Sequence, residues 1–192
     1  MKYSGINHVA LATNNMDRTI RFWRDLLDLR LIAGIGDNGT RQYFFEITEN
    51  MMISFFEWPD VEPVEDKDAG RPAKGPLSLD HICLEVAGAD ELWALKDRLE
   101  AADVWVTEVM DNGFIHSIFA TDPNNIQLEF CYSIEEINLS ANPRIVDSET
   151  SAIAGEGPEP QKGKWPDVDR PTPPDDRKIY PGVLKALVND KK

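Results

Sequence analysis

Polar and apolar residues alternate near the start of the chain, which predicts a β-strand over residues 5–12. In this strand Val9 and Leu11 would face one side of a sheet, and His8 would face the other. A helix is predicted from Asp17 to Leu29, because apolar residues recur there at helical spacing. Three more strand-like runs follow, at 30–33, 41–48 and 51–58. The chain therefore begins with a predicted β-α-β-β-β unit.

The same order of elements is predicted a second time. An amphipathic helix is expected over Asp90–Ala102. Trp23 and Trp93 lie at helical spacing in the two helices and are expected to pack in the core. Strand-like runs flank it at 79–86, 105–109, 114–121 and 126–132. The run Asp122-Pro123-Asn124-Asn125 predicts a tight turn in which an asparagine adopts the left-handed conformation. We therefore expect two modules, at 1–60 and 78–136, joined by a Pro- and Gly-rich linker at 61–77.

Residues 137–192 follow neither pattern. Eight of the 13 prolines lie between Pro143 and Pro181, and apolar residues become sparse. Such a composition cannot bury a core of its own. We predict an extended Pro-rich C-terminal arm, anchored by Trp165 and by apolar residues within 179–187.

Charge and cysteine content narrow the function classes. The net charge of −14 disfavours a nucleic-acid partner, because the chain would repel phosphate groups. No apolar run approaches the roughly 20 residues of a membrane-spanning helix, and the first residues lack the apolar stretch of a signal peptide. The two cysteines form no disulfide-scaffold or CxxC pattern. A soluble protein of the reducing cytoplasm is therefore expected.

One histidine and one glutamate recur at matching points of the two modules. His8 and His81 begin the first strands and are 73 residues apart, while Glu57 and Glu129 lie in the last strands, 72 residues apart. Alternation places Glu57 on the same face of its strand as Phe55. A single histidine or glutamate in a strand is usually structural or solvent-facing, but the matched set favours a metal site. Two imidazoles and two carboxylates suit a divalent first-row metal.

These motifs resemble the vicinal oxygen chelate superfamily, which includes glyoxalase I, the extradiol ring-cleaving dioxygenases and the bleomycin and fosfomycin resistance proteins. The matching runs fall within residues 4–134 and are Asn7-His8-Val9-Ala10-Leu11, Arg21-Phe22-Trp23-Arg24-Asp25-Leu26-Leu27, Asp80-His81-Ile82 and Thr121-Asp122-Pro123-Asn124-Asn125-Ile126-Gln127-Leu128-Glu129. The resemblance implies an α+β fold in which paired βαβββ modules form a half-barrel. It also implies one divalent metal ion, of Ni, Zn, Mn, Co or Fe.

Within that superfamily, the ligand order His8, Glu57, His81 and Glu129 resembles glyoxalase I. The implied activity is a lyase or isomerase reaction on a small substrate with two neighbouring oxygens. Glu57 or Glu129 would remove a proton, and the metal would stabilise the enediolate. A triad of His8, His81 and Glu129 would instead resemble the Fe(II) extradiol dioxygenases, and a metal-free binding protein of the same fold is a third hypothesis. Met110-Asp111-Asn112-Gly113 replaces the loop that helps glyoxalase I hold glutathione, which disfavours a glutathione thioester as substrate.

The same resemblance leads us to expect a homodimer. Modules of this kind pair with one another, and open sheet edges favour association. His8 and Glu57 of one chain would then meet His81 and Glu129 of the other. The third histidine, His116, is expected to face away from the site.

Overall fold

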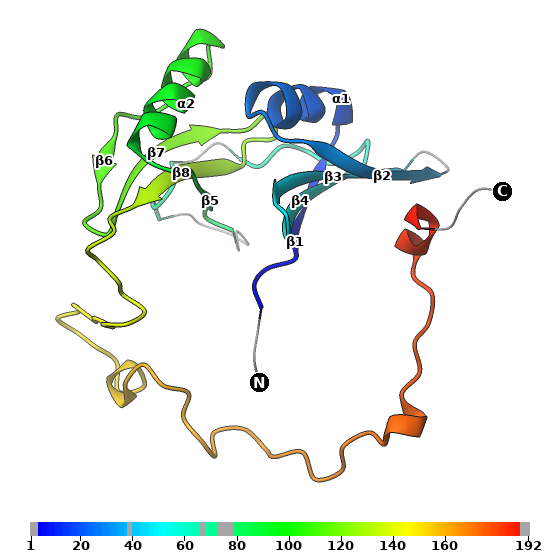
Figure 1. The fold of residues 1–192 in the computed structure, drawn as a ribbon, viewed down its shortest axis with the longest axis vertical. Helices are drawn as coiled ribbons and strands as arrows, with labels where there is room; N and C mark the ends of the chain where they lie inside the picture. Colours follow the sequence, from blue (N-terminus) through cyan, green and yellow to red (C-terminus); the bar gives the residue numbers. More distant parts are fainter. Residues whose placement is uncertain (1–3, 38–39, 66–67, 73–78, 189–192) are drawn as a thin grey trace.

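The computed structural model describes residues 4–37, 40–65, 68–72 and 79–188. Two four-stranded sheets lie side by side, and helices α1 (Met16–Ile20) and α2 (Ala89–Ala101) both lie on the same side of them (Figure 1). Each sheet is the strand part of one βαβββ module. The predicted fold class, a pair of such modules, is therefore confirmed.

The first sheet has the strand order β1-β4-β3-β2. Its strands are β1 (His8–Thr13), β2 (Leu31–Asp37), β3 (Thr40–Thr48) and β4 (Met51–Glu57). Strands β1 and β4 run parallel, and the other neighbours run antiparallel. Each strand of the module was therefore predicted close to its position.

The helical segment of the first module differs from the single helix predicted over Asp17–Leu29. Helix α1 ends at Ile20, and a π-helical segment, η1 (Arg21–Leu26), continues it. The amide of Leu27 donates to the carbonyl of Phe22, five residues back, at 2.9 Å, which is the spacing of a π-helix. Helical periodicity alone does not distinguish this wider turn from an α-helix.

The second sheet repeats the first, in the order β5-β8-β7-β6. Its strands are β5 (Ile82–Glu85), β6 (Met110–Asp111), β7 (Ile115–Thr121) and β8 (Gln127–Ser133). Strands β5 and β8 run parallel, as β1 and β4 do. In the turn between β7 and β8, Asn125 has φ 61°, which confirms the predicted left-handed asparagine.

The strand predicted at 105–109 is wrong. Within it Val106 makes a single isolated bridge to Ala120. The hydroxyl of Thr107 accepts a hydrogen bond from the amide of Phe119 at 2.9 Å. The Thr107 hydroxyl thus takes the place of the backbone carbonyl that would accept this hydrogen bond in a regular β-ladder. The edge strand β6 begins only at Met110.

One hydrophobic core lies between the sheets and the helices, and both modules contribute to it. Trp23 is fully buried, and its indole Nε1 donates to Oδ2 of Asp122 in the β7–β8 turn at 3.2 Å. Burial raises the pKa of Asp122 above its ordinary value. The expectation that Trp93 lies in the core is wrong, because it is 49% exposed. Leu92 and Leu99 instead form the buried face of α2.

The segment between the modules contacts the same turn. Val64 donates its amide to the carbonyl of Asn124 at 3.0 Å and accepts a hydrogen bond from the side chain of Asn125 at 2.9 Å. Of the linker predicted at 61–77, residues 66–67 and 73–77 lie outside the described residues.

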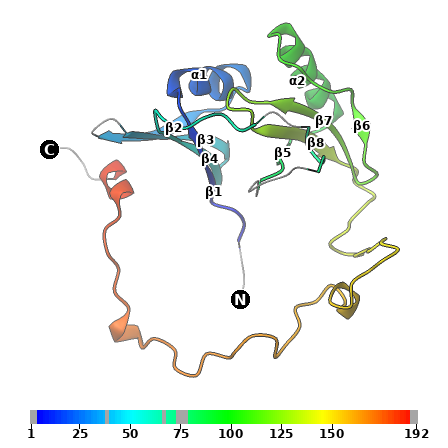
Figure 2. The same cartoon turned by 180° about the vertical axis from the view of Figure 1, so that it is seen from behind.

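The C-terminal arm follows an extended path. It passes around the side of the sheets opposite the helices and returns toward the first module (Figures 1 and 2). Its last described element, the 3-10 helix η4 (Val183–Leu187), packs against β2. Trp165 was predicted to be an anchor, but it is 86% exposed and does not pack on this chain. The arm therefore contacts the body near its end.

Candidate metal centre

Each sheet has an apolar face toward the helices and a second face, which we call the helix-free face. In the first module Val9 and Phe55 pack in the core, so alternation places His8 and Ser54 on the helix-free face. In the second module Leu128 packs in the core. The same alternation therefore puts His81 and Glu129 on the helix-free face.

His81 and Glu129 approach each other on the second sheet. The Nε2 atom of His81 lies 3.2 Å from Oε2 of Glu129, whose side chain is only 8% exposed. The other ring nitrogen, Nδ1, lies 2.7 Å from Oδ1 of Asp80. The ring of Phe119 meets the imidazole edge-on, with centroids 5.5 Å apart. The imidazole is therefore held by a carboxylate on one side and presents Nε2 to a second carboxylate on the other.

This pair fits two adjacent positions of a metal coordination sphere. Nitrogen and oxygen ligands lie about 2.1 Å from a first-row metal, so two ligands at right angles are about 3.0 Å apart. The 3.2 Å between His81 Nε2 and Glu129 Oε2 is close to that separation. A carboxylate on the remote nitrogen, as Asp80 provides, is also the usual support of a metal-binding histidine.

The first sheet repeats this arrangement around His8. Its Nδ1 lies 2.9 Å from Oδ1 of Asn7, and its ring meets that of Phe44 edge-on with centroids 6.0 Å apart. Phe44 pairs with Ser54 across β3 and β4. Ser54 is fully buried and its hydroxyl accepts a hydrogen bond from Nε2 of Gln42 at 3.2 Å. The first sheet therefore holds a histidine with an amide partner and a hydroxyl.

Strand register identifies Ser54, and not Glu57, as the counterpart of Glu129. Ser54 pairs with Ala10, two residues after His8, and Glu129 pairs with Cys83, two residues after His81. Likewise Phe44 pairs with Ser54 as Phe119 pairs with Glu129. Ser54 was not predicted as a site residue.

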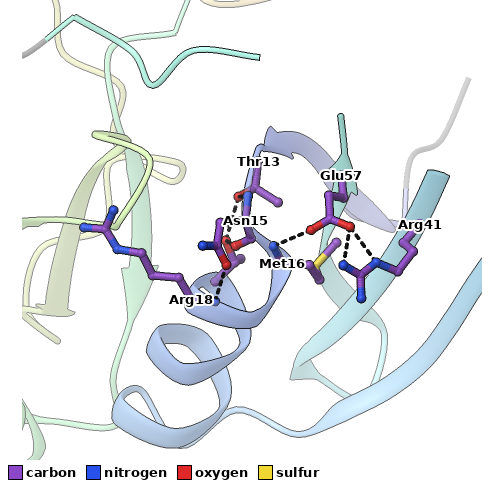
Figure 3. A network of polar contacts seen from close by, with 7 residues as sticks. Thr13, Asn15, Met16, Arg18, Arg41 and Glu57 are labelled. Carbon is purple, nitrogen blue, oxygen red and sulfur yellow. Dashed lines mark hydrogen bonds and ion pairs between the residues drawn. The ribbon is translucent and has the colours of Figure 1, made fainter. Parts of the chain in front are cut away.

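Glu57 does not join the other predicted ligands, which corrects the four-ligand prediction. It lies three residues after Ser54, an odd step that turns its side chain to the helix face. Its Oε1 accepts the amide of Met16, the first residue of α1, at 2.8 Å, and its Oε2 accepts Nε of Arg41 at 2.5 Å (Figure 3). The Arg41 pKa is raised, chiefly by this hydrogen bond.

Glu57 therefore stabilises the start of α1 within the first module. A carboxylate at a helix N-terminus satisfies a free amide and interacts favourably with the helix dipole. Asn15 adds to the same end, since its side chain accepts the amide of Arg18 at 2.9 Å (Figure 3). The guanidinium of Arg41 is engaged in this ion pair with Glu57.

Of the four predicted ligands, the structure brings two together, His81 and Glu129. His8 lies on the helix-free face of the other sheet. Among the described residues no three or more His, Cys, Asp or Glu side chains form a group that could hold a metal. His116 contacts the hydroxyl of Tyr132, 2.5 Å from its Nδ1. It shares a face of β7 with the buried Ile118, so it points away from this site as predicted.

A sequence profile of the Glyoxalase/Bleomycin resistance protein/Dioxygenase superfamily matches residues 5–130. No match to a curated protein was found. Within the parts of the chain that the structure describes, no helix is long and apolar enough to cross a membrane.

Solved structures share the fold. A glyoxylase/bleomycin resistance protein/dioxygenase domain from Frankia sp. EAN1pec is 23% identical, with a TM-score of 0.58, covering 69% of this chain and all of its own. Lactoylglutathione lyase from Agrobacterium tumefaciens is 22% identical, with a TM-score of 0.51, covering 69% of this chain and 96% of its own. The fosfomycin resistance protein FosX from Listeria monocytogenes, complexed with Mn(II) and sulfate, is 18% identical, with a TM-score of 0.53, covering 70% and 97%.

At these identities the structural likeness is one of fold, and the family follows from the profile, which spans both modules. The chain belongs to the Glyoxalase/Bleomycin resistance protein/Dioxygenase superfamily, the vicinal oxygen chelate proteins.

Proposed function

We propose that this protein is a metal-dependent enzyme acting on a small substrate with two neighbouring oxygen atoms. Its divalent ion, one of Ni, Zn, Mn, Co or Fe, would be held by His8, His81 and Glu129. The observation that carries the proposal is the pairing of a nearly buried carboxylate, that of Glu129, with Nε2 of the oriented His81 imidazole, 3.2 Å apart. Three protein ligands leave positions open for the two substrate oxygens.

Glu129 rather than Glu57 is the proposed catalytic base. Bound to these residues, a divalent ion would supply a Lewis acid for a substrate carbonyl. Glu129 faces that position, and a carboxylate within reach of the substrate can take a proton from the carbon beside the carbonyl. Glu57 is held by Met16 and Arg41 on the opposite face of its sheet. Asp80 would keep Nδ1 of His81 protonated and so fix the orientation of the ring.

The metal site is tested by elemental analysis of protein purified without chelators or a His-tag. We expect about one equivalent of divalent metal per chain, lost in His81→Ala and in Glu129→Gln. His116→Gln is the matched control, because His116 lies on the other face and contacts Tyr132. Equal metal content in all four proteins would refute the proposed ligands.

The reaction class is tested separately, because a His-His-carboxylate triad is also the set that non-haem Fe(II) oxygenases use. Proton abstraction predicts exchange of the α-proton of small 2-hydroxy ketones with deuterated water, followed by NMR. Oxygen activation predicts ring cleavage of catechols after anaerobic loading with Fe(II) and admission of air. Exchange without cleavage favours the lyase or isomerase, and cleavage alone favours the dioxygenase. Stoichiometric binding of these ligands with no turnover would point to a binding protein.

We further propose that two copies share each site, with His8 of one chain completing the pair on the other. The two histidines lie on different sheets, which suits a two-fold dimer. The test mixes His8→Ala with Glu129→Gln after joint refolding. In a shared-site dimer about a quarter of the sites regain all three ligands, because half of the dimers are mixed and each holds one intact site. Sites confined to single chains would regain nothing, and a monomer in light scattering would exclude sharing.

A further inference from the structure

The only two cysteines of the chain lie side by side on the helix-free face of the second sheet. The thiol of Cys83, on β5, donates a hydrogen bond to Sγ of Cys131, on β8, at 3.3 Å. Cys131 is buried and Cys83 is exposed, so the pair can be reached from one side. Neither thiol is used by the proposed reaction.

The backbone does not favour a disulfide here. Cys83 pairs with Glu129 and Cys131 pairs with Glu85, so the two cysteines are diagonal neighbours on parallel strands. Strands about 4.8 Å apart and an offset of two residues at about 3.3 Å each put their Cα atoms about 8 Å apart. Disulfides rarely span more than about 7 Å without backbone movement. The amide of Val86 also donates to the carbonyl of Cys131 at 2.8 Å, which holds β5 and β8 in register.

An ion between the two sulfurs needs much less movement than a direct bond. Two metal–sulfur bonds of about 2.3 Å in one line, the arrangement of a two-coordinate ion, put the sulfurs about 4.6 Å apart. Side-chain rotations that move the sulfurs apart by a little over 1 Å reach that separation from 3.3 Å. Two thiolates are enough for a soft ion that prefers few ligands, and Cu(I) is the physiological ion of that kind.

We propose that Cys83 and Cys131 form a second metal site, which binds one Cu(I) ion through two sulfurs. On binding, each thiol gives its proton to the buffer, two copper–sulfur bonds form and the copper stays Cu(I). The site shares the helix-free face with the pair of His81 and Glu129 but uses none of its atoms. It therefore does not depend on the proposed enzymatic function.

The test is an anaerobic titration of the reduced full-length protein with Cu(I), in competition with a colorimetric Cu(I) chelator. We expect one equivalent per chain with ultraviolet copper–thiolate absorption, and at least a 100-fold weaker affinity in Cys83→Ser. Cys83 is the better position to replace, because Cys131 is buried; thermal melting verifies that the variant is folded. Met110→Ser is the control, because it removes a sulfur atom from β6, the far edge strand of the same sheet, and leaves both thiols.

Mn(II) binding, measured on the same proteins, separates this site from the proposed catalytic one. We expect Cys83→Ser to bind Mn(II) like the wild type and Glu129→Gln to keep its Cu(I). Unchanged Cu(I) affinity in Cys83→Ser would overturn the proposal. So would reversible loss of both thiols to a disulfide under mild peroxide, in a protein that takes up no Cu(I).

Discussion

The two sheets hold a histidine in the same structural setting, but the polar side chains around that histidine differ. Each carries a histidine at the start of its first strand, with an oxygen of the preceding residue on Nδ1 and a phenylalanine ring edge-on to the imidazole. In the second sheet the preceding residue is Asp80 and the cross-strand neighbour is Glu129. In the first sheet the same places hold Asn7 and Ser54.

This difference shows that the two modules keep a common scaffold with unequal charge. The second module supplies two carboxylates to its histidine, and the first supplies an amide and a hydroxyl. A cation is therefore favoured on the second sheet, and the first is left with His8 as its one strong metal ligand on this frame. The glutamate of the first module, Glu57, has a structural role at the start of α1.

Substitutions at the two equivalent positions, Glu129 and Ser54, should give the largest difference between the sheets. Glu129→Gln should weaken divalent metal binding by about 100-fold or more, because it removes an anionic ligand. Ser54→Ala should change metal affinity by no more than about twofold. Ser54 occupies the strand position equivalent to that of Glu129, but it has no anionic group to bind a metal. Isothermal titration with Mn(II) measures both. Similar losses in the two variants would mean that the sheets contribute equally.

The structural role of Glu57 gives the next largest effect. Glu57→Gln should lower the free energy of unfolding by about 1–2 kcal/mol, since it removes the charge beside Arg41 and the α1 amide; the half-exposed arginine limits the loss. Metal affinity should not change. Urea unfolding measures the loss, with Glu46→Gln as the control, because Glu46 pairs with the exposed Arg30 on the same sheet. A stable variant that has lost its metal would restore Glu57 as a ligand.

Installing the missing carboxylate should make the first sheet more like the second. Ser54→Glu is expected to tighten Mn(II) binding by about tenfold, because a fourth ligand becomes available. It should also lower the melting temperature of the metal-free protein, since Ser54 is fully buried and a carboxylate there loses solvation. Calorimetry with and without Mn(II) tests both parts. A destabilised variant with wild-type affinity would show that this position does not face the ion.

The smallest expected effect is at the residue that orients His81. Asp80→Asn keeps an oxygen near Nδ1, as Asn7 does in the first sheet, but removes the charge. We expect Mn(II) affinity to fall by about three- to tenfold, toward the lower end of what such supporting groups contribute. The matching change Asn7→Asp should raise affinity slightly if His8 is a ligand. Unchanged Mn(II) affinity in both variants would show that these side chains do not support the metal-binding histidines.

Most strands were predictable because their alternation is set by burial on one face only, but the run at 105–109 was not, since a threonine side chain interrupts the ladder there. The helix from Asp17 was located but not its π-helical continuation, because the two forms bury similar residues at similar spacing. Trp93 was assigned to the core from its helical spacing and Trp165 to an anchor from its apolar character, and both are exposed. Composition does not specify which surface, if any, covers such a residue.

The site was half predictable. His81 and Glu129 lie together, as the predicted ligand set requires, and alternation around Leu128 and Phe130 is enough to place Glu129 on that face. Glu57 was matched to Glu129 by residue type and offset, which ignored strand parity. Aligning Ile53-Ser54-Phe55 with Leu128-Glu129-Phe130 by their apolar flanks would have selected Ser54. The contact of Glu57 with the α1 amide depends on how the helix packs, which no local pattern in the sequence records.

The hydrogen bond between Trp23 and Asp122 ties one repeat to the turn of the other, inside a core that both repeats build. A repeat cut out of the chain would expose that core and lose part of it. The duplicated halves are thus a single cooperative folding unit, which should melt in one calorimetric transition. Two fragments separated in the segment between them should regain native structure only when mixed. Duplication has here produced halves that resemble each other and yet depend on each other to fold.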